Sequence, residues 1–192
     1  MKITVFCGAR FGNQKNYGET ARLIGNELAK RKIELVYGGS TSGTMGAISQ
    51  AVLENGGKVT GIYPEGLFED ELPRKNTTSF IQTTTTTMAQ RKELLINSGD
   101  AFLILPGGLG TLEELSQLLS NMALGIIPQR KISILNINGF YDNLIQLLNN
   151  FIDAKFMDAL CKDDLLISAD YQVLLEELTA SESKSTKQEL SA

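Results

Sequence analysis

The stretch at residues 100–114, DAFLILPGGLGTLEE, decides the fold of this chain. Residues 101–105 form an unbroken apolar run, which predicts a strand covered on both faces. Pro106 ends the strand, and three glycines then allow the backbone to turn sharply and approach a ligand closely. Thr111 opens a segment whose apolar residues have helical spacing. The unit is therefore a strand, a glycine turn and a helix.

The glycine turn of this unit has the geometry of an anion site. Free backbone N–H groups and the positive end of the helix dipole point at one place, and a phosphate is the simplest occupant. In open α/β sheets, ligands bind just beyond the carboxyl ends of the strands. A structural alternative stays open, because Thr111 and Glu114 have the spacing of a capping box. Both interpretations can be true, since a capping carboxylate can also face a ligand.

Length and composition describe an ordinary soluble globular protein. A chain of 192 residues suits one domain with a sizeable core, and 42% hydrophobic with 21% charged residues is typical of that class. The net charge of −4 argues against general nucleic-acid binding, because phosphates require a basic excess. The N-terminus has no signal-peptide layout and no apolar run approaches about 20 residues, so we expect a cytoplasmic protein without a membrane partner.

Histidine is absent from the chain, which excludes several kinds of catalytic site. Ser-His-Asp and Cys-His nucleophile systems and imidazole metal sites all require it. Cys7 and Cys161 lie far apart without metal-ligand spacing, so we predict no metal site and a reducing compartment. We expect Cys7 to be a small buried apolar side chain. Catalysis must then use carboxylates, Lys, Arg, Tyr or an outside cofactor.

Segments of strand and helix character alternate along the chain. Strands are predicted at residues 2–7, 33–37, 58–63, 77–87, 101–105 and 131–136. Helices are predicted at residues 14–32, 47–56, 88–98, 112–124, 140–153 and 170–179, with Thr87 as a cap. This alternation predicts an α/β fold with a doubly wound parallel sheet, in a single domain over residues 1–180. Residues 181–192 are polar, and we expect a disordered tail there.

Two further segments carry candidate binding residues. The second strand ends in GGSTSGTMG at residues 38–46, where Gly39 and Gly43 either bind a ligand or only turn the chain. The pattern is not a Walker loop, because Thr44 stands where that loop needs a lysine, and it matches a dinucleotide fingerprint poorly. Arg91 lies beside the apolar stripe of its helix. The alternative to a functional role is a snorkelling side chain or a surface ion pair.

The order of these motifs resembles the LOG family, named after the plant "Lonely guy" protein and often labelled "possible lysine decarboxylase" in bacteria. PGGLGTLEE at residues 106–114 fits the PGGxGTxxE signature of that family in full. The resemblance covers roughly residues 1–180. Its further matches are Phe6-Cys7-Gly8 with Gly12 and Tyr17, residues 35–39 with Gly43, Met45 and Gly46, Pro64 with Leu67 and Glu71, Met88-x-x-Arg91-Lys92, and Asn136-x-x-Gly139-Phe140-Tyr141-Asp142.

The resemblance implies a Rossmann-like fold, a homodimer with its site near the subunit contact, and activity as a nucleoside 5′-monophosphate phosphoribohydrolase. Such an enzyme cleaves the N-glycosidic bond of cytokinin riboside monophosphates, and often AMP, to release the free base and ribose 5-phosphate. The resemblance also implies that Arg91 and Glu114 are the catalytic pair. The expected substrate-binding residues are Glu71, Lys92, Gly107, Gly108, Leu109, Gly110, Thr111, Leu112 and Glu113, together with Gly39 and Gly43 of the second glycine turn.

The side chains of the implied catalytic pair suit this chemistry. Cleavage of a ribosyl C–N bond builds positive charge on the sugar, and a carboxylate near the anomeric carbon stabilises that charge and orients water. Glu114 stands one helical turn, about 5 Å, beyond the turn that would hold the phosphate. Three roles stay open for Arg91: contact with the phosphate, polarisation of the leaving base, or fixing Glu114. The scheme requires no metal and no organic cofactor.

The chain departs from the family pattern near the expected base pocket. Residues 88–92 read MAQRK without the usual histidine, the turn at 38–46 differs, and residues 120–130 lack the usual Trp, Gln and His. The identity of the base therefore stays open. Two other functions also stay open: a nucleotide-binding sensor or carrier without catalysis, and lysine decarboxylation. The latter needs a lysine that forms a Schiff base with pyridoxal phosphate, and Lys92 is the candidate near the site.

Overall fold

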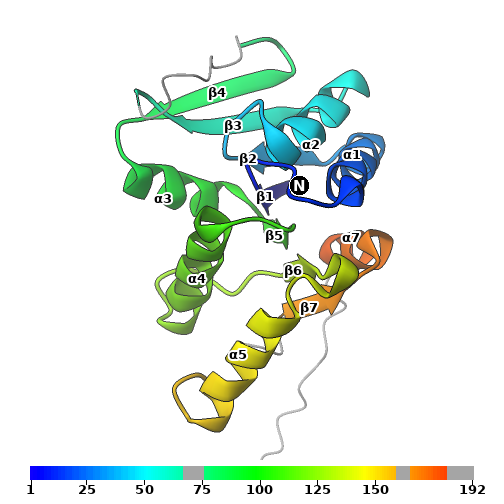
Figure 1. Cartoon of the computed structure of the whole chain (residues 1–192). Helices are drawn as coiled ribbons and strands as arrows, with labels where there is room; N and C mark the ends of the chain where they lie inside the picture. The colour runs from blue at the N-terminus through cyan, green and yellow to red at the C-terminus, as the bar shows by residue number, and fades with distance from the viewer. Residues whose placement is uncertain (67–75, 159–164, 181–192) are drawn as a thin grey trace, which may run out of the picture.

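A single parallel sheet forms the centre of the protein (Figure 1). The structure is a computed structural model that describes residues 1–66, 76–158 and 165–180. Over these ranges, seven strands lie in the order β4-β3-β2-β1-β5-β6-β7, and every neighbouring pair is parallel. The strands are β1 (Lys2–Phe6), β2 (Glu34–Tyr37), β3 (Val59–Pro64), β4 (Phe80–Thr85), β5 (Ala101–Ile104), β6 (Ile132–Leu135) and β7 (Leu165–Ser168).

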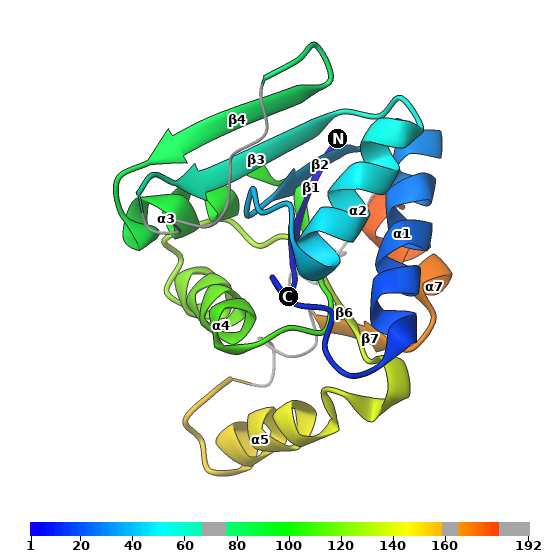
Figure 2. The same ribbon diagram turned by 45° about the horizontal axis from the view of Figure 1, so that its top comes forward.

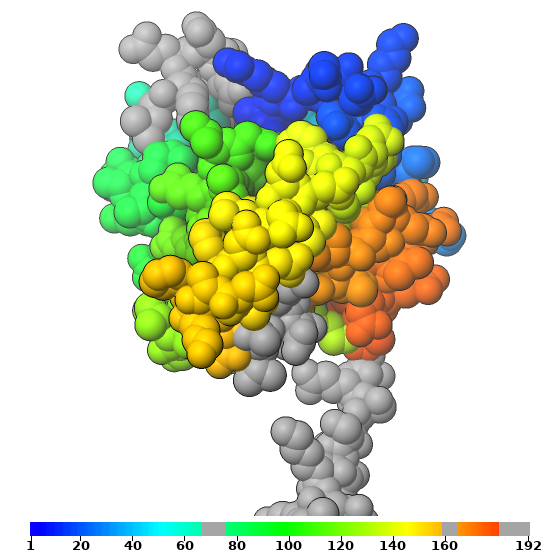
Figure 3. Space-filling model, turned by 60° about the horizontal axis from the view of Figure 1, so that its bottom comes forward, coloured from blue at the N-terminus to red at the C-terminus, as the bar shows by residue number. Residues whose placement is uncertain are grey.

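Helices cover both faces of the sheet (Figure 1, Figure 2). One face packs against α1 (Lys15–Lys30), α2 (Gly43–Glu54) and α7 (Tyr171–Thr179), and the other against α3 (Met88–Ser98), α4 (Leu109–Ala123) and α5 (Asp142–Asp153). A short 3-10 helix, η1 (Ile137–Gly139), precedes α5. Over the described ranges, none of these helices has the length and apolarity needed to cross a bilayer. In the space-filling view, α5 spans the surface between α4 and α7 (Figure 3).

Successive residues of each central strand point to opposite faces and build two hydrophobic cores. Val5 and Leu103 belong to the core under α1, α2 and α7, whereas Phe6 and Phe102 belong to the core under α3, α4 and α5. The rings of Phe6 and Phe102 stack with their centroids 5.9 Å apart. Both faces of the central strands β1, β5 and β6 are buried, which explains why these strands are rich in apolar residues. The prediction of a doubly wound parallel sheet is confirmed.

The winding direction of the chain reverses between β1 and β5. From β1 the chain proceeds outward to β2, β3 and β4, and from β5 it proceeds in the other direction to β6 and β7. The carboxyl ends of these two strands lie side by side, with Phe6 paired to Ile104. A crevice opens at such a switch point, because the loops that follow the two strands turn away from each other. The glycine turn that follows β5 is one wall of this crevice.

Three local predictions need correction. The capping box of Thr111 and Glu114 is wrong, because α4 begins at Leu109 and its N-cap is Gly108. Strand β7 was not predicted from the sequence, and α2 begins at Gly43, inside the second glycine turn. By contrast, α3 has the predicted bounds, and the Thr87 side chain accepts a hydrogen bond from the N–H of Gln90 as a cap. The predicted tail at residues 181–192 lies outside the described residues.

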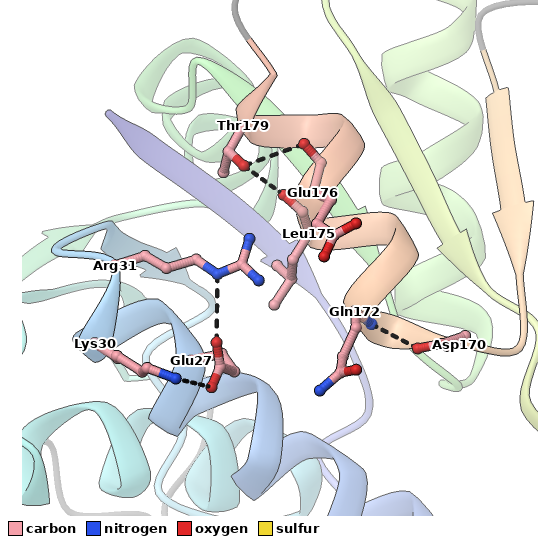
Figure 4. Close-up of polar contacts among 8 residues, drawn as sticks. All are labelled: Glu27, Lys30, Arg31, Asp170, Gln172, Leu175, Glu176 and Thr179. Atoms are coloured by element: carbon pink, nitrogen blue, oxygen red, sulfur yellow. Dashed lines mark hydrogen bonds and ion pairs between the residues drawn. The ribbon is translucent and has the colours of Figure 1, made fainter.

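Polar contacts lie at the ends of α7 and near the end of α1 (Figure 4). At the start of α7, the N–H of Gln172 donates to the Asp170 carboxylate over 2.8 Å, and at its end the Thr179 hydroxyl donates to the Leu175 carbonyl over 2.8 Å. On α1, Glu27 accepts from Lys30 and Arg31 at 3.3 and 3.4 Å. None of these residues lies in the loops after β1 and β5, and the contacts lie at helix ends rather than build a site.

Candidate active site

A cavity of about 520 Å³ lies at the switch point, above the carboxyl ends of β1 and β5. The loops after β1, β2 and β5 form most of its wall, and residues of α1, α2, α3, α4, β3 and the segment after β6 complete it. Its lining includes both residues of the predicted catalytic pair and most of the glycine turn. The lining residues are Cys7, Gly8, Ala9, Arg10, Phe11, Gly12, Tyr17, Gly38, Ser40, Met45, Tyr63, Met88, Arg91, Pro106, Gly107, Gly108, Gly110, Thr111, Glu114 and Phe140.

The start of α4 places N–H groups that have no partner inside the helix next to this cavity. Because Gly108 is the N-cap, the amides of Leu109, Gly110 and Thr111 precede the first intrahelical hydrogen bond, which runs from the N–H of Leu112 to the Gly108 carbonyl. The N-cap has no side-chain hydrogen bond. Three N–H donors without a partner inside the helix, at the positive end of the helix dipole, suit an anion.

Gly107 fills a position that no larger residue fits. A Cβ there would overlap the side chain of Thr111 and would come within 3.1 Å of the backbone nitrogen of Gly8. The close approach brings the turn after β5 against the loop after β1. The two loops therefore frame one site, as the glycine pattern predicts.

The most buried polar contact in the cavity joins Arg91 of α3 to Glu114 of α4. The Nη1 atom of Arg91 donates to Oε1 of Glu114 over 2.9 Å, and the two residues are only 6% and 4% exposed. Arg91 also donates through Nε to the carbonyl of Ile62 at 3.1 Å and through Nη2 to the carbonyl of Gly38 at 3.2 Å. The alternatives of a snorkelling side chain or a surface ion pair are therefore wrong for Arg91. Of its three open roles, the geometry matches fixing Glu114.

Burial sets the protonation of the acidic groups at this site. It raises the pKa of the Glu114 carboxyl above its ordinary value, and the positive charge and hydrogen bond of Arg91 oppose that rise. Burial also raises the pKa of the Cys7 thiol to about 12. Cys7 is a free, fully buried thiol, so it stays protonated and is no nucleophile, as predicted.

Several predicted binding residues lie beside the cavity rather than in its lining. Lys92 and Glu113 form an ion pair with each other on the outer side of α3 and α4. The side chains of Leu109 and Leu112 are 85% and 41% exposed and point to the surface. Glu71 lies outside the described residues, so its place relative to the cavity is not described.

The two glycines of the second turn support the wall of the cavity from behind. Gly39 and Gly43 have φ angles of 82° and 58°, in the left-handed region that favours glycine. A Cβ on Gly43 would overlap the backbone of Ala9, so this glycine allows the loop after β2 to pack on the loop after β1. Thr44 ties the same two loops together, because its hydroxyl donates to the carbonyl of Gly8 over 2.7 Å.

Sequence reasoning missed the aromatic and cationic part of the lining. Phe11, Tyr17 and Phe140 come from three separate segments, and the rings of Tyr17 and Phe140 meet edge to face with centroids 5.8 Å apart. Arg10 is exposed on the loop after β1 and lines the same cavity. The matches to the family at Tyr17 and Phe140 were the available signal, but their meeting depends on how β1 and β6 are ordered in the sheet.

The fold and this site define a class: a Rossmann-like α/β protein with a glycine turn at the start of a helix, beside a buried Arg–Glu pair. The model of a family described as "possible lysine decarboxylase" matches residues 45–178. The chain is 37% identical to the cytokinin riboside 5′-monophosphate phosphoribohydrolase LOG2 of Arabidopsis thaliana, covering 91% of this chain and 81% of that protein. It is 38% identical to the probable cytokinin riboside 5′-monophosphate phosphoribohydrolase LOGL1 of Oryza sativa subsp. japonica, covering 88% and 74%. The chain belongs to the LOG family.

Solved structures share the same fold at lower sequence identity. The molybdenum cofactor binding protein of Rippkaea orientalis superposes with a TM-score of 0.67 at 20% identity, covering 92% of this chain and 94% of that one. The molybdenum cofactor carrier protein of Chlamydomonas reinhardtii gives a TM-score of 0.67 at 17% identity, covering 94% and 98%. At these identities the likeness concerns the fold alone.

Proposed function

We propose that this chain hydrolyses the N-glycosidic bond of purine nucleoside 5′-monophosphates, namely cytokinin riboside monophosphates, AMP or both, to the free base and ribose 5-phosphate. The curated relatives at 34–38% identity are named cytokinin riboside 5′-monophosphate phosphoribohydrolases, some of them as probable ones. The observation that carries the proposal is the buried pair of Arg91 and Glu114 beside the open amides of α4. An anion site next to an oriented carboxylate is what this reaction requires.

In the proposed mechanism, the amides of the α4 start hold the 5′-phosphate and Glu114 faces the ribose. As the C1′–N bond breaks, its electron pair leaves with the base, which takes up a proton, and positive charge develops on the sugar. The Glu114 carboxylate stabilises that charge and accepts a proton from water as the water oxygen bonds to C1′. Glu114 then releases this proton to solvent, which supplies the proton that the base takes up, so that the net reaction consumes one water. Arg91 is held by the carbonyls of Ile62 and Gly38, so its charge favours the ionised form of the Glu114 carboxylate and its hydrogen bond directs that carboxylate.

The remaining predicted binding residues take indirect places in this scheme. Gly107, Gly108, Gly110 and Thr111 line the cavity and would contact the phosphate, and Leu109 would contribute its amide. The ion pair of Lys92 and Glu113 joins α3 to α4 at the positions next to Arg91 and Glu114, so it would keep the two helices in register. Leu112, Gly39 and Gly43 would support the walls, and Glu71 stays a prediction.

We also propose that the protein forms a homodimer. The resemblance to LOG proteins implies one, and large apolar side chains are exposed on α3 and α4 near the cavity, namely Leu94, Leu109 and Leu112. A second copy covering them would bury apolar surface that water otherwise contacts. A cytoplasmic location and the lack of a nucleic-acid partner stay predictions from the sequence.

The two alternative functions have less support. The carriers among the solved structures share only the fold at 17–20% identity, whereas the phosphoribohydrolases are relatives at 34–38% identity. Decarboxylation through pyridoxal phosphate needs a lysine that reaches the ligand. Among the described residues that line the cavity there is no lysine, and the amine of Lys92 is paired with Glu113 outside it.

Incubation with nucleotides tests the proposed function. We expect AMP or N6-substituted AMP to yield free base and ribose 5-phosphate in equal amounts, measured by chromatography of both products. Adenosine, which lacks the phosphate, is the matched control and should be cleaved at least about a hundredfold more slowly, because the anchoring contacts are lost. Failure to release base from any purine monophosphate would contradict the proposal. Release of nucleoside with inorganic phosphate would show a phosphatase instead.

The pH dependence of turnover should report the buried carboxylate. Because the ionised form of Glu114 acts and burial raises its pKa, turnover should fall as the pH drops through a value above the ordinary 4.5 of glutamate. The measurement is kcat/KM for AMP between about pH 4 and pH 9, with stability checked at each pH. An acid limb at or below 4.5 would show that the acting carboxylate is not buried as Glu114 is.

A further inference from the structure

A tyrosine outside the cavity is hydrogen-bonded to the last residue before the glycine turn. Tyr141 lies between η1 and α5, is 7% exposed, and donates its hydroxyl hydrogen to the carbonyl of Leu105 over 2.7 Å. Its burial raises the pKa of the phenol, so the hydroxyl stays protonated and keeps donating. The ring is not part of the cavity lining, although its neighbour Phe140 is. Any effect of Tyr141 on a ligand therefore passes through Leu105.

The peptide between Leu105 and Pro106 has only one polar group that can be anchored. Proline has no N–H, so the carbonyl of Leu105 is the sole hydrogen-bonding group of that peptide. The N–H of Leu105 is already paired with the carbonyl of Phe6 over 2.9 Å, which ties the end of β5 to β1. The hydroxyl of Tyr141 therefore fixes the direction in which the chain leaves the strand and enters the glycine turn.

The segment after β6 is built to place this tyrosine. The N–H of Tyr141 donates to the side-chain oxygen of Asn136 over 2.7 Å, and the side-chain amide of Asn136 donates to Asp142 over 2.7 Å. Asn138 between them has a φ angle of 56°, a conformation that few residues other than glycine and asparagine adopt. These three local features turn the chain back so that the phenol of Tyr141 reaches the end of β5.

We propose that Tyr141 is a positioning residue for the phosphate of the substrate: its hydrogen bond to Leu105 aligns the amides of the glycine turn. The inference rests on the proposed function. Arg91 and Glu114 are held by β2, β3 and α4 rather than by Tyr141, so the reacting groups keep their geometry without it. Loss of the phenol should weaken the grip on the phosphate equally in the substrate and in the transition state. That change raises KM and leaves kcat nearly unaltered.

The variant Tyr141→Phe removes the hydroxyl and keeps the ring. We expect KM for AMP to rise about tenfold, the effect of one lost buried hydrogen bond, with kcat within about twofold of wild type. Calorimetry should show the same loss of affinity for ribose 5-phosphate. Asn136→Ala loosens the segment that holds Tyr141, so it should raise KM less, and combining both changes should raise KM no further than Tyr141→Phe alone.

A destabilised control separates positioning from a general loss of stability. Leu178→Ala empties part of the core under α7, on the face of the sheet opposite to Tyr141, where the amine of Lys131 bonds the carbonyls of Glu177 and Ala180. It should lower the melting temperature at least as far as Tyr141→Phe and leave KM unchanged. An unchanged KM in Tyr141→Phe, or a fall in kcat alone, would overturn the proposal. If the wild type turned over no nucleotide, the proposed function would fail, and the calorimetric affinities would still decide the role of Tyr141.

Discussion

Glu114→Gln is expected to lower kcat for nucleotide hydrolysis by about a thousandfold or more. Glutamine keeps the size of glutamate and can still accept the hydrogen bond from Arg91, so the cavity should keep its shape. It carries no negative charge to stabilise the sugar cation and cannot take a proton from water. The phosphate contacts are untouched, so we expect the affinity for AMP to stay within about threefold of wild type. Single-turnover product release and calorimetric binding of AMP measure the two effects separately.

A matched exposed glutamate provides the control for this variant. Glu177 lies on α7, far from the cavity, and Glu177→Gln makes the same chemical change without touching the site. Its kcat and KM should equal those of the wild type. Turnover by Glu114→Gln at the wild-type rate would remove Glu114 from the mechanism, even if nucleotides still bound tightly.

Arg91→Met is expected to cost about 3–5 kcal/mol of folding stability and most of the activity. It leaves the buried Glu114 carboxylate without its partner, and the carbonyls of Ile62 and Gly38 lose their donors. The pKa of Glu114 should then rise further, because the positive charge that opposes the effect of burial is gone. Any residual turnover should therefore have its acid limb at higher pH. Urea unfolding measures the stability, and the pH profile of residual activity measures the shift.

Two further variants test whether burial of the ion pair causes the loss of stability in Arg91→Met. Arg91→Met combined with Glu114→Gln should be more stable than Arg91→Met alone, because no uncompensated charge is then buried. Lys30→Met breaks the exposed pair with Glu27 at 3.3 Å and should change stability little, since water screens that pair. Equal losses of folding stability in Arg91→Met and Lys30→Met would contradict the view that burial makes the Arg91–Glu114 pair important for stability.

Periodicity predicted most of the fold, and its failures have local causes. The helix at 88–98 was predicted with its true bounds, because a threonine cap and a regular apolar stripe coincide there. Strand β7 is only four residues, LLIS, at the edge of the sheet, and so short an apolar run has no distinctive period. The glycine pattern predicts too late a start for α4, because it assigns Gly110 to the turn although Gly110 lies in the first turn of the helix. Glycine tolerates both conformations, so sequence does not distinguish them.

The site divides into a local part and a part assembled by the fold. The glycine turn could be predicted, because strand, turn and helix follow one another in one segment. The meeting of Arg91 and Glu114, 23 residues apart, was implied by family resemblance, but its burial and the contacts to Ile62 and Gly38 depend on tertiary packing. The convergence of Phe11, Tyr17 and Phe140 depends on the sheet order. The hydrogen bond from Tyr141 to Leu105 joins the segment after β6 to the end of β5, and no spacing in the sequence predicts it.

Much of the cavity wall belongs to different parts of the chain from the proposed catalytic pair. Arg91 and Glu114 stand on α3 and α4, whereas the loops after β1 and β2 supply much of the remaining surface. Replacements in those two loops can therefore change which nucleobase fits the cavity while Arg91 and Glu114 stay unchanged. Relatives that diverge in substrate preference should differ first in these loops, so evolution can retune selectivity here without rebuilding an enzyme.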